Sequence, residues 1–169
     1  IARMPVYVLD SNFFIQAHRF HYPIDVAAGF WNKVRQLAEA GRIISIDKVQ
    51  KELYDKNDAL EEWCSNKLPE AFFKDTSVVM AAYGQVIAWA MSRSGHYLPN
   101  ALNEFLDADE ADAFLVAYCL ADPVNNFIVT HEVSEPNRQN KVKIPDACVA
   151  LNVSYMNTIG MFRQLRETF

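Results

Sequence analysis

The sequence predicts an α/β protein in which a central parallel sheet is covered by helices on both faces, a Rossmann-like three-layer α/β/α arrangement. Short apolar runs rich in β-branched residues occur at 6–9, 43–46 and 126–130, as expected of strands buried on both faces. Longer segments with helical periodicity separate these runs, and strands separated by helices usually run parallel. A chain of 169 residues that is 51% hydrophobic suits one core. We therefore expect one domain over 1–169.

Each strand is predicted from its apolar run and the turn residues beside it. Pro5 and Asp10 bound the first run, and Asp122-Pro123 forms the turn before the third. A short last strand is expected at 153–155.

The helices are predicted from apolar periodicity, from polar residues at their starts and from Gly or Pro at their ends. Polar residues suited to begin a helix are Ser11 or Asn12, Asp25, Asp47, Asp75 or Thr76, and Asn157. In chain order, the predicted helices lie at 11–18, 25–41, 47–54, 59–66, 75–91, 99–106, 109–120, 144–151 and from 157 onward. The segments 19–23 and 132–143 are expected to be loops.

Composition restricts the possible functions. With 16 Lys and Arg against 21 Asp and Glu, the formal net charge is -5, so a polyanion would have to bind at a local basic patch. The three cysteines are widely spaced and form no C-x-x-C motif, which favours reduced thiols over a disulfide framework or a zinc site. We expect a cytoplasmic protein, because no signal-peptide pattern and no membrane-length apolar stretch is evident.

Two acidic residues come after the first two strands. Asp10 comes directly after the run 6–9, where ligands of open α/β sheets bind. Asp10 is equally suited to cap the next helix, but Ser11 and Asn12 could do this instead. Glu52 lies on the helix after the second strand, near the edge of its buried face, although a lone helical Glu is usually just solvated.

The run 107–117 is the strongest acidic feature after the first strand. Asp109 and Asp112 are three residues apart, so on a helix they would share a face and repel each other unless a cation lay between them. Acidic residues are also common where a helix simply starts. Asp112 is harder to explain in that way, because the apolar run 113–119 comes directly after it.

Glu132 lies just after the apolar run 126–130, in the same way that Asp10 lies just after the run 6–9. Convergence of these residues would create an all-oxygen ligand set without Cys or paired His, which favours Mg²⁺ or Mn²⁺ over zinc. Such ions activate water for attack on phosphorus. The predicted chemistry is phosphodiester hydrolysis.

These residues carry a resemblance to a known superfamily. The segments around Asp10, Glu52 and Asp112, together with Thr130-His131-Glu132, resemble the PIN-domain ribonucleases, in particular the VapC-like toxins of toxin-antitoxin pairs, and the chain looks like a longer branch of that superfamily. The resemblance implies RNA cleavage with Asp10, Glu52 and Asp112 as catalytic residues, and Mg²⁺ or Mn²⁺ bound by these three and Glu132. It also implies a homodimer that a small cognate antitoxin inhibits. The chain departs from the family at Glu132, where the fourth acid is usually Asp.

Further polar segments have two interpretations each. Two clusters are either ordered surface loops, which is the simpler interpretation, or contacts for RNA. The first contains His18, Arg19, Phe20, His21 and Tyr22, and the second contains Arg138, Lys141 and Lys143. Asp146 could equally join the acidic site or cap the helix after Pro145.

Two other classes of protein share part of this pattern. A haloacid-dehalogenase-type phosphatase also places an Asp after its first strand, but it needs a second Asp where this chain has Asn12. The remaining rival is a catalytically degenerate PIN-like binding module that acts through protein partners.

Overall fold

The computed structural model describes residues 4–169. Its centre is a five-stranded, all-parallel sheet with the order β3-β2-β1-β4-β5. The strands are β1 (Val6–Leu9), β2 (Ile43–Ile46), β3 (Phe73–Lys74), β4 (Asn126–Val129) and β5 (Tyr155–Met156). In the middle of the sheet, Val8 pairs with Ile44 on one side and Ile128 on the other. The predicted central parallel sheet is therefore confirmed.

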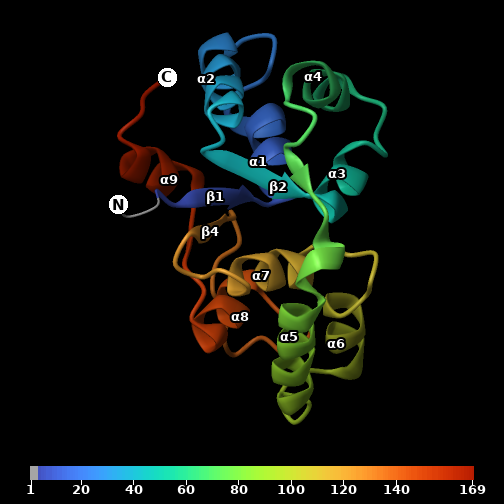
Figure 1. Ribbon diagram of the computed structural model, residues 1–169. Coiled ribbons are helices and arrows are strands. Elements are labelled where there is room, and N and C mark those ends of the chain that lie inside the picture. The colour runs from blue at the N-terminus through green and yellow to red at the C-terminus, as the bar shows by residue number, and fades with distance from the viewer. Residues whose placement is uncertain (1–3) are drawn as a thin grey trace.

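Helices cover both faces of the sheet (Figure 1). One layer contains α1 (Ser11–Gln16), the π-helical turn η1 (Ala17–His21), α2 (Ala28–Glu39), α3 (Asp47–Leu53), α4 (Ala59–Lys67) and α9 (Thr158–Leu165). The opposite layer contains the 3-10 turn η2 (Thr76–Val79), α5 (Met80–Ser92), α6 (Pro99–Phe105), α7 (Asp112–Leu120) and α8 (Ile144–Leu151). The molecule thus has three layers of Rossmann-like α/β/α type.

Aromatic and aliphatic packing holds the layers on the sheet. In the first layer, the ring of Phe30 on α2 lies 6.0 Å from that of Phe13 on α1 and 6.1 Å from that of Phe162 on α9. In the opposite layer, Tyr83 of α5 stacks on Phe114 of α7 at 4.1 Å. Each large apolar side chain that is fully buried stabilises the fold by roughly 1.5–3 kcal/mol. This packing fixes the strand ends that carry the polar residues.

The two shortest strands are predicted poorly, because two residues give too little sequence pattern to locate a strand. The sequence does not predict β3, because two residues at the sheet edge give no alternation to detect; it pairs with Ser45 and Ile46 of β2. The last strand lies at Tyr155–Met156 rather than 153–155, where it pairs with Ile128 and Val129.

One helix end and two helix starts also differ from the prediction. The loop expected at 19–23 is helical through His21, because a wide turn closes with a bond from Tyr22 N to Ala17 O at 2.6 Å. The helix α2 has Ala27, not Asp25, at its N-cap. The N-cap of α3 is Ile46, not Asp47. Asp47 instead accepts a hydrogen bond from Thr76 Oγ1 at 2.8 Å and so links α3 to η2.

Within residues 4–169, every helix is too short or too polar to cross a bilayer. Cys64, Cys119 and Cys148 are buried with free thiols.

Candidate active site

The strand order places the candidate site between β1 and β4. From β1 the chain builds outward through β2 to β3, and then returns to add β4 and β5 on the other side of β1. In open α/β sheets, the crevice at such a reversal, beyond the carboxyl ends of the strands, is where ligands bind. Asp10 comes after β1 and Thr130 after β4 at this position.

Asp10 is a buried carboxylate without a cationic partner among the ion pairs of residues 4–169. It is only 2% exposed, and its Oδ2 accepts a hydrogen bond from Thr130 Oγ1 at 3.0 Å. Burial, with a further contribution from the negative charge of Glu132, raises the pKa of Asp10 to about 7, although the Thr130 hydrogen bond opposes this. The side chain occupies the N-cap position of α1 without making a capping bond. Asp10 is thus the N-cap residue, as the capping alternative expects, but its carboxylate is directed to Thr130 rather than to the backbone of α1.

Asp112 approaches Asp10 from the opposite helical layer. It is the first residue of α7 and is partly buried. Burial raises the pKa of Asp112 well above its usual value, and the negative charges of Asp10 and Glu132 raise it further. Lys141 acts in the opposite direction. Since these charges affect one another, Asp112 belongs to the same cluster as Asp10.

Glu52 contributes the third carboxylate, from α3. Burial and the charge of Glu110 raise its pKa, whereas hydrogen bonds with the Ser11 side chain and the Ala111 backbone lower it. In turn, the charge of Glu52 raises the pKa values of both Asp10 and Asp112. Residues from a strand end and two helices thus form one acidic cluster, in which Asp10 is buried and Glu52 and Asp112 are partly buried.

Glu132 lies beside this cluster but is held by other partners. Its side chain is 7% exposed, and its Oε2 accepts a hydrogen bond from Ile144 N at 3.2 Å. Its Oε1 lies 3.8 Å from Lys143 Nζ and 3.9 Å from Lys141 Nζ. Glu132 therefore ties the 132–144 loop to the edge of the site, and its charge is balanced locally.

The two other acidic candidates lie outside the cluster. Asp109 precedes α7, is 76% exposed and pairs with Lys51 at 3.2 Å, so the predicted shared helical face with Asp112 is wrong. The helix begins later than predicted because residues 107–109 form a turn, closed by a bond from Asp109 N to the Asp107 side chain. Asp146 accepts hydrogen bonds from Ser134 Oγ at 2.5 Å and Glu135 N at 3.1 Å. It anchors the loop after β4, which is neither of the two roles considered.

The donor chemistry suits a hard divalent cation, although the ligands do not form a closed cage. Within residues 4–169, no three His, Cys, Asp or Glu side chains are arranged so that they could hold a metal ion. Yet the cluster offers only carboxylate oxygens, the ligands that Mg²⁺ and Mn²⁺ prefer. Burial is the largest cause of the raised pKa values of Asp10, Glu52 and Asp112, and neighbouring negative charges raise them further, so a bound cation would favour the ionised carboxylates.

Thr130, Ser11 and Lys141 support the cluster, and sequence reasoning assigns none of them a role in it. Thr130 could have been found, because Leu9 pairs with Val129 and the next residues on both strands, Asp10 and Thr130, therefore emerge side by side. Ser11 and Lys141 carry no such signal, since each depends on how separate segments pack.

The fold and the cluster define a Rossmann-like α/β protein with a buried acidic site at the carboxyl edge of its sheet. Residues 7–169 match the model of a family described as a domain of unknown function (DUF4411), and the chain belongs to that family. Searches among curated proteins and among solved structures gave no match.

Proposed function

We propose that this protein is a divalent-metal-dependent endoribonuclease of PIN-like type that hydrolyses RNA phosphodiester bonds. The observation that carries the proposal is the buried cluster of Asp10, Glu52 and Asp112, whose pKa values are all raised. Burying like charges without a cation is costly, and proteins tolerate that cost chiefly where it serves a function. Its place at the strand-order reversal is where an α/β protein binds its ligand.

In this mechanism, Asp10, Glu52 and Asp112 would hold Mg²⁺ or Mn²⁺, and Glu132 would approach the ion from the loop after β4. The bound ion would polarise a phosphoryl oxygen and acidify the attacking water. Thr130 keeps the Asp10 carboxylate in position through its 3.0 Å hydrogen bond. Lys141 and Lys143, which flank Glu132, are placed to neutralise phosphate charge of the bound strand.

Chelation tests the metal requirement directly. The purified protein should cleave a mixed RNA pool, EDTA should abolish cleavage, and Mg²⁺ or Mn²⁺ should restore it. Asp112→Asn should be inactive while retaining its circular dichroism spectrum, and the exposed Asp109→Asn serves as the matched control. Cleavage that survives exhaustive chelation would overturn the mechanism.

The resemblance to VapC-like toxins extends the proposal to partners. A homodimer inhibited by a small antitoxin is expected, and an Arg of that antitoxin would match the paired carboxylate oxygens at the metal position. Inhibition should then weaken as Mg²⁺ rises at fixed ionic strength, and Asp10→Ala should loosen antitoxin binding. An affinity that responds to neither change would place the antitoxin elsewhere.

The alternative is a catalytically degenerate binding module. Two observations favour it: the carboxylates form no ready metal cage in the described chain, and Glu132 is occupied by Lys141, Lys143 and Ile144. A pure protein that binds a partner, yet cleaves no RNA with either metal, would establish this alternative.

A further inference from the structure

A cavity of 230 Å³ opens where η1, the segment after β4 and the start of α9 meet. Its lining includes two histidines, a tyrosine and both polar and apolar residues at the start of α9, namely His21, Tyr22, His131, Asn157, Thr158 and Ile159. His131 lies between Thr130, which binds Asp10, and Glu132. The cavity is therefore close to the position where the proposed reaction takes place.

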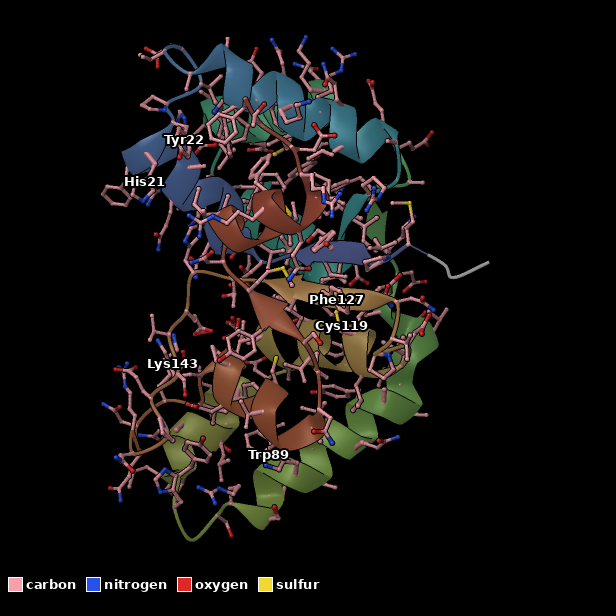
Figure 2. All side chains as sticks on the ribbon, turned by 90° about the vertical axis from the view of Figure 1, so that its left-hand side faces the viewer. His21, Tyr22, Trp89, Cys119, Phe127 and Lys143 are labelled. Atoms are coloured by element: carbon pink, nitrogen blue, oxygen red, sulfur yellow. The ribbon has the colours of Figure 1, made fainter. Side chains whose placement is uncertain are left out.

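His131 also lines a second, more polar depression of 370 Å³. That depression is bordered by the carboxylates of Glu132 and Glu135 and by three cations, Arg138, Lys141 and Lys143. The two hollows thus share a wall at the carboxyl end of β4. His21, Tyr22 and Lys143 lie toward the same side of the molecule in Figure 2.

We infer that the 230 Å³ cavity binds one unstacked base of the RNA substrate, while the adjacent lysine-lined depression holds phosphate of the same strand. This inference rests on the proposed ribonuclease function, and it adds a determinant of sequence preference. Proteins read single-stranded RNA by taking up splayed bases against aromatic or imidazole rings and hydrogen-bonding their edges.

The size and rigidity of the cavity fit a single ring system. At 230 Å³ it is smaller than the roughly 300–1,000 Å³ typical of pockets for drug-sized ligands. Tyr22 forms a fixed wall, because it stacks on Phe30 at 4.5 Å and its carbonyl accepts a hydrogen bond from Trp31 Nε1 at 2.7 Å. The π-helical turn Ala17–His21 delivers His21 beside it, and such wide turns often occur at functional sites.

The polar groups around the cavity are oriented before any ligand binds. Thr158 Oγ1 lies 3.0 Å from His131 Nε2, which fixes both side chains. Asn157 Oδ1 accepts a hydrogen bond from Gly160 N at 2.8 Å, so the amide is held by its oxygen and its NH₂ group is left to donate. A base with an acceptor on its edge would match this donor.

The lysine-lined depression offers a local group of cations in a chain whose net charge is negative. With a formal net charge of -5, the protein needs a confined basic surface to hold RNA. The side chain of Lys143 is 14% exposed and lies 3.5 Å from Glu135 and 3.8 Å from Glu132, whereas Lys141 is 37% exposed and lies 3.9 Å from Glu132. A phosphate bound there would lie within one nucleotide of a base in the cavity, because the two hollows share His131.

The test uses Asn157→Asp, which keeps the oxygen that caps α9 but replaces the amide donor with a carboxylate. Asn66→Asp, on an exposed position of α4, adds the same charge elsewhere. Cleavage rates are measured on RNAs that carry each of the four bases at every position flanking the cut. The wild type and Asn66→Asp should prefer one base at one position, and Asn157→Asp should reduce that preference roughly tenfold.

A binding measurement separates this inference from the proposed function. Four RNA pentamers that differ at the central base are titrated into Asp10→Asn protein, with and without Asn157→Asp, by calorimetry. If no variant cleaves RNA but one pentamer binds selectively and Asn157→Asp removes that selectivity, the base site stands and the nuclease proposal fails. If RNA is cleaved with equal rates for all bases, or no pentamer binds selectively, the inference is overturned.

Discussion

The ends of β1 and β4 share the same design in sequence but differ in how their acidic residues are balanced. The two strands are neighbours, with Leu9 opposite Val129, and a carboxylate lies within three residues of the end of each. Asp10 is 2% exposed and faces other acids, whereas Glu132 has Ile144 N and two lysines around it. The two strand ends therefore look alike in sequence, although the charge of Asp10 is unpaired and the charge of Glu132 is paired with lysines.

This difference in charge balance arises from the segment that follows each strand. Asp10 lies directly between β1 and α1, so the chain supplies only Ser11, Asn12 and Thr130 as neutral hydrogen-bond donors. Glu132 instead begins a long loop that returns at Lys143 and brings its own cations. An acid whose charge is left unbalanced is a candidate for cation binding, and a balanced one is a candidate for structural support.

The largest effect is expected from removing the charge of Asp10. Asp10→Asn should reduce RNA cleavage at least about 1,000-fold, which corresponds to about 4 kcal/mol of transition-state stabilisation. The metal-free fold should be as stable as the wild type at pH 8 or more so, because Asn can still accept the Thr130 hydrogen bond without burying a charge. Cleavage kinetics and urea unfolding measure the two parts. A variant that unfolds would show that Asp10 is structural.

The pH dependence of stability should reveal the same unbalanced charge. The pKa of Asp10 is about 7 in the folded state against an ordinary value of 3.8, so the folded protein binds more protons than the unfolded one between these values. Metal-free stability should consequently fall as pH rises from about 4 to about 7, by on the order of 1–4 kcal/mol.

Asp112 and Glu52 carry raised pKa values as well and add to the slope, whereas Lys141 opposes it at Asp112. Urea unfolding of wild type and Asp10→Asn across this range is the measurement. The variant should show a clearly shallower dependence, and saturating Mg²⁺ should flatten the wild-type curve. Identical slopes would mean that Asp10 is not the group that titrates.

Much of this arrangement is predictable from sequence, because it depends on the ends of regular elements. The apolar run 6–9 predicts both the first strand and the place of Asp10, and Asp112 stands out because it precedes the buried run 113–119. The sequence places the start of α7 too early and so predicts that Asp109 lies beside Asp112. The error arises because a helix start rich in acidic residues gives the same sequence pattern when the helix begins one turn later. The balance at Glu132 is not predictable in this way, because it depends on a loop that closes back on Glu132 from as far along the chain as Lys143.

A smaller effect is expected from Glu132, where the charge is balanced. Glu132→Gln keeps an acceptor for Ile144 N but leaves Lys143 without its closest buried anion, so stability should fall by roughly 0.5–1.5 kcal/mol. Because the charge of Glu132 raises the pKa of Asp10, the same variant should also move the stability transition to lower pH. Urea unfolding at pH 5 and pH 8 measures both, with Glu70→Gln as the exposed control. An unchanged transition would separate Glu132 from the cluster.

The smallest effect is expected at Asp109, which tests where the acidic site ends. Its carboxylate is 76% exposed and its partner Lys51 is 66% exposed, so their 3.2 Å ion pair is screened by water. Asp109→Asn should therefore change stability by less than about 0.5 kcal/mol and leave cleavage within about twofold of wild type. Lys51→Met should behave alike, since it breaks the same pair from the other side. A tenfold loss of cleavage in Asp109→Asn alone, with Lys51→Met unaffected, would show that Asp109 acts on the substrate or the metal, and the turn 107–109 would then have to be counted as part of the active site.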